Sequence, residues 1–104
     1  LATLPRHGHG LIVADAAHPE SLVRHVHAAL GDEPVAILVN NSAGPPPGAI
    51  ASATAAQFLD TVQQQLLAAH GLAQHLLPGM RVQRFGRIIN IISTSVRIPL
   101  KNLG

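Results

Sequence analysis

Three short apolar runs alternate with two segments of helical periodicity, and this order constrains the fold more than any other feature of the sequence. The runs, at residues 11–14, 35–39 and 86–93, are rich in Ile and Val. Apolar runs of this length are typical of strands that are buried on both faces of a parallel sheet. The order strand, helix, strand, helix, strand is that of a parallel sheet with right-handed crossovers. We therefore predict an α/β fold with three parallel strands and two crossover helices.

The first predicted helix spans residues 19–30. Pro19 suits the first turn of a helix, and Glu20 is favourably placed near its positive end. His18 takes the N-cap position, where Asp, Ser or Asn would be more usual. Gly31 follows the last apolar residue and is expected to end the helix.

The second predicted helix is longer and spans residues 54–77. Thr54 and Gln57 have the spacing of a capping box, in which each side chain binds the backbone of the other residue. Pro78, followed by glycine, is expected to end the helix. The stripe that we expect to be buried on this helix consists of Phe58, Val62, Leu66, Ala69, Ala73 and Leu76.

Composition narrows the class of protein further. The chain has 104 residues, enough for one domain, of which 47% are apolar and only 2% aromatic. It has no cysteine, which excludes disulfides and thiolate metal sites and fits a reducing compartment. The apolar runs are too short to span a membrane. We therefore expect a soluble, cytoplasmic protein that has no membrane partner.

Three arginines precede the last predicted strand at intervals of three residues. They are Arg81, Arg84 and Arg87, and the formal net charge of the whole chain is only +2. A basic group of this kind can contact phosphate, but it is more often a solvated loop. We interpret it as such a loop and expect no nucleic-acid partner.

Polar side chains follow each of the three predicted strands. They are Asp15, the pair Asn40 and Asn41, and Ser93. In an open α/β sheet, ligands bind outside the carboxyl ends of the strands, and neighbouring strands lie about 4.8 Å apart. These residues are therefore expected to line one ligand crevice. The alternative is that they are ordinary strand-ending and turn residues, a role that Asp, Asn and Ser often have.

Three segments of the chain resemble the short-chain dehydrogenase/reductase family. ILVNNSAGPPPG resembles its Asn-Asn-Ala-Gly segment, LLPGMRVQRFGRIINIISTS its serine-bearing strand, and VADAAHPES an earlier strand whose Asp contacts adenine. The resemblance covers nearly the whole chain, in order. It implies a partial Rossmann-type, doubly wound parallel sheet, with residues 1–104 as a single partial nucleotide-binding domain. It also implies NAD or NADP as cofactor and a small carbonyl or alcohol as substrate.

The resemblance implies a set of cofactor contacts. Asp15 would hydrogen-bond the adenine amino group, and Asn40 would steady its strand and border the cofactor. A close-packed turn at residues 42–44 would lie beside the adenosine half, and Ile91 and Ile92 would lie beneath the nicotinamide. The implied cofactor-binding residues are Asp15, Asn40, Asn41, Ser42, Ala43, Gly44, Ile91 and Ile92.

The resemblance also implies two catalytic positions and a reaction. Ser93 matches the catalytic serine, whose hydroxyl polarises the substrate carbonyl. A donor of this kind can stabilise a transition state by about 2.7–4 kcal/mol. Gln65 stands where the family usually places an asparagine that anchors a proton-relay water. The implied activity is that of an NAD(P)-dependent oxidoreductase, which transfers hydride to or from a carbonyl or alcohol.

Two parts of the family pattern have no counterpart in the sequence. The family's glycine-rich phosphate loop would precede this region, and the Gly-x-Gly at residues 8–10 precedes a predicted strand instead of following one. The chain has no tyrosine and a single lysine, Lys101, so the family's Tyr-x-x-x-Lys pair is absent. A general acid typically contributes about 10²–10⁴-fold to a rate. We therefore expect the full-length parent to be the enzyme and this chain alone to be inactive.

Two other functions stay open at this point. A non-catalytic remnant could keep the fold as a scaffold, with the helix at residues 54–77 pairing across a homo-oligomer interface. A metal site could form at His7 and His9 or at His25 and His27. On a helix, however, side chains two residues apart lie on nearly opposite sides. With no cysteine and few carboxylates nearby, we expect no metal site.

Overall fold

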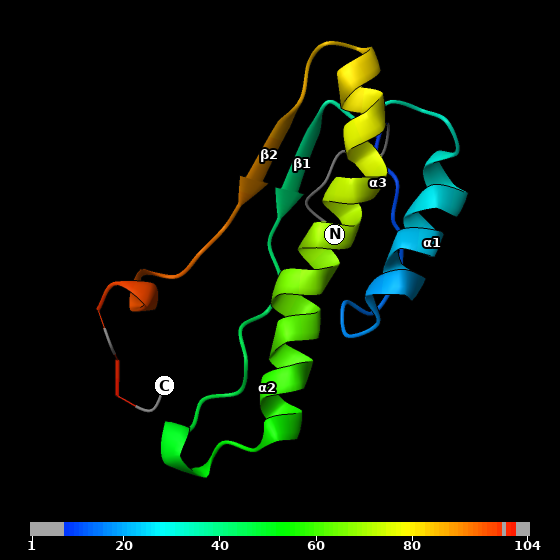
Figure 1. Cartoon of the computed structure of the whole chain (residues 1–104). Helices are drawn as coiled ribbons and strands as arrows, with labels where there is room; N and C mark the ends of the chain where they lie inside the picture. The colour runs from blue at the N-terminus through cyan, green and yellow to red at the C-terminus, as the bar shows by residue number, and fades with distance from the viewer. Residues whose placement is uncertain (1–7, 99, 102–104) are drawn as a thin grey trace.

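The computed structural model describes residues 8–98, 100 and 101. Figure 1 shows a small sheet with helices beside it, and the loops that follow the two strands extend on the strand side of the central helix. In chain order, the elements are helix α1 (Pro19–Leu30), strand β1 (Ile37–Asn40), the 3₁₀ turn η1 (Ile50–Ser52), helix α2 (Ala55–Val62), the π-helical turn η2 (Gln63–Leu67), helix α3 (Ala68–Val82), strand β2 (Arg87–Asn90) and the 3₁₀ turn η3 (Thr94–Val96).

Strands β1 and β2 form a parallel sheet, and Figure 1 shows them side by side with the same direction. The register places Ile37 opposite Arg87 and Asn40 opposite Asn90. Just past the strand ends, the N–H of Ile91 still donates to the Asn40 carbonyl at 2.9 Å. Both strands are shorter than the runs that predicted them, but their parallel pairing across a helical crossover confirms the α/β class.

The predicted strand at residues 11–14 is wrong for the described structure. No ladder joins this run to β1 or β2, and Val13 is 81% exposed. A short strand is stable only when neighbours supply hydrogen bonds and burial, and here they supply neither. In the Rossmann strand order 3-2-1-4-5-6, two other strands separate the third from the fourth. The run at residues 11–14 corresponds to the third strand of this order, and β1 and β2 correspond to the fourth and fifth. The run would therefore lie too far from β1 and β2 to pair with them.

Helix α1 has the predicted bounds. His18 occupies the N-cap position, although its side chain makes no capping hydrogen bond, and Pro19 is the first helical residue. Gly31 ends the helix with φ at 56°, and its N–H donates to the His27 carbonyl at 2.8 Å. A residue other than glycine would be strained in this left-handed backbone conformation, so the sequence signal and the structure agree.

Elements α2, η2 and α3 form one continuous helix over residues 55–82. The capping box is confirmed, because Thr54 N–H donates to Gln57 Oε1 at 2.8 Å and Gln57 N–H donates to Thr54 Oγ1 at 3.2 Å. The predicted end at Pro78 is wrong, since α3 continues through this proline. Proline removes one helical hydrogen bond. Met80 in the next turn is only 4% exposed, and its burial offsets that loss.

Helix α1 packs against α3, which lies between α1 and the strands in the view of Figure 1. The two helices come close at Gly71, where an added Cβ would stand 3.1 Å from Val23 Cγ2. Glycine at this position therefore lets the two helix backbones come together. None of the helices in the described part of the chain combines the length and apolar character needed to cross a membrane.

The core of the described structure is small. Its buried apolar side chains are Leu38, Ala68 and Met80. The radius of gyration is 16.1 Å, against about 13 Å for a compact domain of 100 residues. The helical stripe predicted to be buried is therefore only partly covered: Phe58 is 53% and Leu66 62% exposed. None of the six residues of the predicted stripe is buried, and the two buried residues of this helix, Ala68 and Met80, lie outside the stripe, so this prediction is wrong for the described structure.

Candidate active site

A hollow of about 930 Å³ lies where the carboxyl ends of β1 and β2 meet η2 and α3. This volume falls within the range of roughly 300–1,000 Å³ that is usual for small-molecule sites. Residues far apart in the sequence meet here, from the loop after β1, from the π-helical turn and from the loop after β2. Most of the site residues implied by the family resemblance line the hollow, namely Asn40, Asn41, Ser42, Gly44, Gln65, Ile91, Ile92 and Ser93.

Asn40 is bound across the sheet to Asn90, the residue opposite it in the register. Asn40 Nδ2 donates to Asn90 Oδ1 at 2.8 Å, and both residues line the hollow. An amide side chain has a donor and an acceptor group. This bond orients both amides at the mouth of the hollow. Asn90 was missed by the sequence reasoning, although it ends its strand as Asn40 ends β1.

Gln65 joins the π-helical turn to the loop after β1. Its Oε1 accepts a hydrogen bond from Ser42 Oγ at 3.0 Å, and its Nε2 donates to the Ala43 carbonyl. Ala43 thus belongs to the same contact although it does not line the hollow. The residues that the resemblance placed beside the cofactor and in the proton relay are in direct contact with each other.

Ser93 follows β2 and caps the short turn η3. Its Oγ accepts a hydrogen bond from Ser95 N–H at 3.1 Å and another from Ser95 Oγ at 2.8 Å. A serine hydroxyl has two acceptor positions and one proton. With both acceptor positions used by Ser95, the Ser93 proton is left to donate to another oxygen. The local structure therefore suits Ser93 to polarise a carbonyl.

Ile91 and Ile92 supply an apolar surface beside Ser93. Both line the hollow, and Ile92 is 74% exposed. Exposed apolar side chains beside a few polar groups are the usual lining of cofactor sites. Across the hollow, an added Cβ on Gly44 would meet nothing within 4 Å, so the turn after β1 leaves open space there. The loop after β2 therefore gives the hollow an apolar lining beside the Ser93 hydroxyl.

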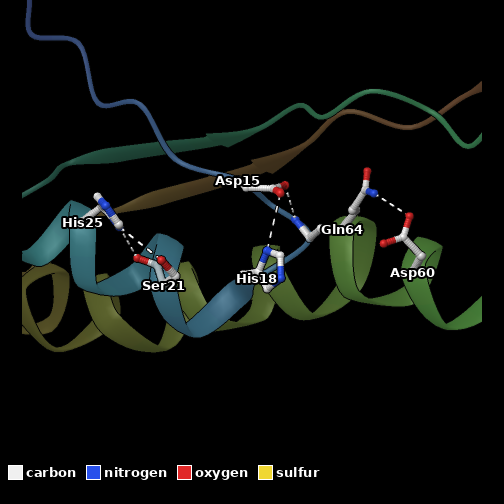
Figure 2. A network of polar contacts seen from close by, with 7 residues as sticks. Asp15, His18, Ser21, His25, Asp60 and Gln64 are labelled. Atoms are coloured by element: carbon white, nitrogen blue, oxygen red, sulfur yellow. Dashed lines mark hydrogen bonds and ion pairs between the residues drawn. The ribbon is translucent and has the colours of Figure 1, made fainter.

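Asp15 precedes α1 and does not line the hollow, although the next residue, Ala16, does. Its Oδ1 accepts from Ala17 N–H at 2.9 Å, and its Oδ2 lies 3.4 Å from His18 Nδ1. Figure 2 shows these contacts, together with separate pairs formed by Ser21 with His25 and by Asp60 with Gln64. The crevice predicted from three strand ends therefore gathers the ends of β1 and β2, without Asp15.

The histidines of the described residues form no metal cluster. No group of three or more His, Asp or Glu side chains lies close enough together there to hold a metal ion. His25 Nδ1 lies 2.6 Å from the Ser21 carbonyl, and the His27 ring packs edge-on against His75 at a centroid distance of 5.1 Å. His9 stands in the loop before α1, and His7 lies outside the described residues.

Solved structures of oxidoreductases share the fold of this chain. A 3-oxoacyl (acyl-carrier-protein) reductase from Agrobacterium tumefaciens with NADP bound matches 86% of the chain at 21% identity and a TM-score of 0.76. L-sorbose reductase from Gluconobacter frateurii, complexed with NADPH and L-sorbose, matches 86% of the chain at 32% identity and a TM-score of 0.73. A short-chain dehydrogenase from Streptomyces avermitilis matches 88% of the chain at 26% identity and a TM-score of 0.73.

The chain spans about a third of the length of these structures, with coverage of 35%, 34% and 34% respectively. Their match confirms the Rossmann-type fold. No curated protein sequence matches the chain. The family model described as short chain dehydrogenase matches residues 8–104. The chain therefore belongs to the short-chain dehydrogenase/reductase family.

Proposed function

We propose that this chain is the middle portion of an NAD(P)-dependent oxidoreductase that transfers hydride to or from a carbonyl or alcohol. The observation that carries the proposal is the meeting of Asn40, Gln65, Ile91 and Ser93 around one hollow at the carboxyl ends of the sheet. This is where ligands bind in open α/β folds. The sorbose reductase relative, whose structure contains NADPH and L-sorbose, supports the same class of reaction.

The proposed cofactor site follows from the residues around the hollow. Asn40 and the turn at residues 42–44 would border the dinucleotide, and Asp15, outside the hollow, would bind the adenine amino group. Ile91 and Ile92 would lie beneath the nicotinamide, which supplies or accepts the hydride. Preference between NAD and NADP is left to measurement, because either dinucleotide presents the same nicotinamide to these side chains.

In the proposed mechanism, Ser93 acts on the substrate oxygen. Its proton is free to donate because its acceptor positions are used by Ser95. A hydrogen bond to the carbonyl oxygen becomes stronger as negative charge develops there, so it accelerates the chemical step more than it strengthens substrate binding. The chain contains no tyrosine. The proton that completes carbonyl reduction would therefore come from another part of the full-length protein, and this chain alone would show no turnover.

Titration of the purified chain with NADH and NADPH tests the cofactor part of this proposal. We expect nicotinamide fluorescence to change on addition of the chain and to saturate. In the full-length protein, Ser93→Ala should leave the dissociation constant within twofold and lower kcat by about 10²–10³-fold. Absence of binding to both nucleotides would contradict the proposal, as would a Ser93→Ala enzyme with normal kcat.

A second candidate is a non-catalytic scaffold that assembles as a homo-oligomer through the helix at residues 54–77. The exposure of Phe58, Leu59 and Leu66 on one stretch of this helix favours it. Apolar side chains of this size are usually covered in a soluble protein. The proposed occupant is the same helix of a second copy. Sedimentation equilibrium of Leu66→Lys against the unchanged chain tests this, and an unchanged monomer–dimer equilibrium would contradict it.

We also propose a cytoplasmic location. The absence of cysteine from all 104 residues supports it, because disulfides stabilise many small proteins of oxidising compartments. Fractionation of cells that express the tagged full-length protein would test this, and recovery with secreted proteins would contradict it.

A further inference from the structure

The helix that borders the hollow changes its winding where it meets the loop after β1. In η2, the N–H of Ala68 donates to the carbonyl of Gln63, five residues earlier instead of the usual four. Such π turns insert one extra residue and shift the side chains that follow around the helix axis. They are found frequently at functional sites. Gln65 is the central residue of this turn.

Both hydrogen-bonding groups of the Gln65 side chain bind the loop after β1. Its acceptor Oε1 receives the Ser42 hydroxyl proton at 3.0 Å, and its donor Nε2 binds the Ala43 carbonyl. Only an amide offers a donor and an acceptor side by side at this length. A glutamate would have two acceptors, one of which would face the Ala43 carbonyl and repel it. An asparagine would be one methylene shorter.

Gln65 supplies the hydrogen bonds that hold the turn at residues 42–44, whereas the loop beyond this turn forms a separate bridge at Gly48. Within the described residues, residues 42–44 make no hydrogen bond besides the two to Gln65. All three residues are exposed, and three prolines follow, which supply no backbone donors. The position of this turn beside the hollow therefore depends on the side chain of Gln65.

We propose that Gln65 is a positioning residue that holds the turn at residues 42–44 in its cofactor-binding shape. This deepens and rests on the proposed function, because the turn is assigned to the cofactor through that function. The role differs from a place in a proton relay, since the Gln65 amide is already engaged by Ser42 and Ala43. Loss of this contact should let the turn move and weaken binding of the dinucleotide.

The test compares Gln65→Glu, which keeps the length of the side chain but loses the donor, with Gln63→Glu. The second variant makes the same change on the same π turn, and no side-chain hydrogen bond of Gln63 is found among the described residues. Two properties are measured in the purified protein. One is the backbone order parameter S² of residues 42–44 without ligand, from ¹⁵N NMR relaxation, and the other is the NADPH dissociation constant from fluorescence.

We expect Gln65→Glu to lower the backbone order parameter S² at residues 42–44 below about 0.6, the range of a flexible segment, and to raise the NADPH dissociation constant roughly 3- to 10-fold. The order parameter at Leu38 should stay unchanged, which shows that the sheet is folded. Gln63→Glu should change neither property at this loop. In Gln65→Asn, the shorter amide should restore neither property fully.

An unchanged order parameter at residues 42–44 in Gln65→Glu would overturn the positioning role, whatever the protein binds. A lower order parameter with an unchanged NADPH dissociation constant would overturn its link to the cofactor. If the unchanged protein bound neither nucleotide, the proposed function would fail, while the relaxation measurement would still decide whether Gln65 holds the turn.

Discussion

Asn40 and Asn90 face each other across the two strands, and Asn40 Nδ2 donates to Asn90 Oδ1 at 2.8 Å. The pair stands at the carboxyl end of the sheet, where both residues line the hollow. Neither residue is buried, so this contact is made within reach of solvent. It connects the last residues of β1 and β2 at the edge of the hollow.

This bond should be measurable as a coupling between the two asparagines. We expect Asn40→Ala and Asn90→Ala each to lower the free energy of unfolding by about 0.5–1.5 kcal/mol. The double variant should lose less than the sum of the two, because the second change removes a group that has already lost its partner. Urea unfolding of the four proteins measures the coupling, with Asn41→Ala as a control of the neighbouring amide. Strict additivity would contradict the contact.

The capping box at the start of α2 gives a second prediction. Thr54→Ala should destabilise the protein by about 1 kcal/mol, because the N–H of Gln57 loses its side-chain acceptor. Thr54→Ser keeps the hydroxyl and should stay within a few tenths of a kcal/mol of the unchanged protein. Circular dichroism during urea unfolding measures both. Equal stability of the alanine and serine variants would argue against the cap.

Two glycines near the end of α3 should respond oppositely to alanine. An added Cβ at Gly79 meets nothing within 4 Å, so Gly79→Ala should stabilise the helix by about 0.5–1 kcal/mol. At Gly86, an added Cβ would stand 2.7 Å from Met80 Cβ and Cγ, so Gly86→Ala should cost roughly 1–3 kcal/mol. Thermal unfolding of the two variants compares them directly. A stabilising Gly86→Ala would show that Met80 does not pack there.

Helix bounds could be predicted where the signals are local. Pro19 and Gly31 delimit α1, and Thr54 with Gln57 opens α2, as expected. Each of these signals acts on backbone groups within four residues. The predicted stop at Pro78 failed because burial of Met80, a contact made through the folded chain, outweighs one missing hydrogen bond.

A strand forms only where a neighbouring strand pairs with it, and the local sequence does not show which segment that neighbour is. The run at residues 11–14 has the same apolar character as the run that forms β1, yet only β1 finds a neighbour, in β2. The π-helical turn at Gln65 could not be predicted from the spacing of apolar residues, because that spacing assumes 3.6 residues per turn. It is defined by a backbone hydrogen bond from the Ala68 N–H to the Gln63 carbonyl, which no spacing of apolar residues predicts.

Most residues of the candidate site could be predicted from the resemblance to the short-chain dehydrogenase/reductase family. The contacts between these residues could not. Ser93 and Gln65 were identified as catalytic positions from the family pattern. The pattern gave no indication that Gln65 binds Ser42 or that Asn90 binds Asn40. An aligned comparison of the two strands would have suggested the second contact, because each asparagine ends a run of four residues.

The most direct test of the account is to map NADPH onto the protein by NMR. Backbone amide shifts of the purified, isotope-labelled chain are recorded as NADPH is added. The account predicts saturable changes at residues 40–44 and 91–93, with little change at the far end of α1 around His27. No saturable change, or changes confined to α1, would contradict the assignment of the hollow as the cofactor site.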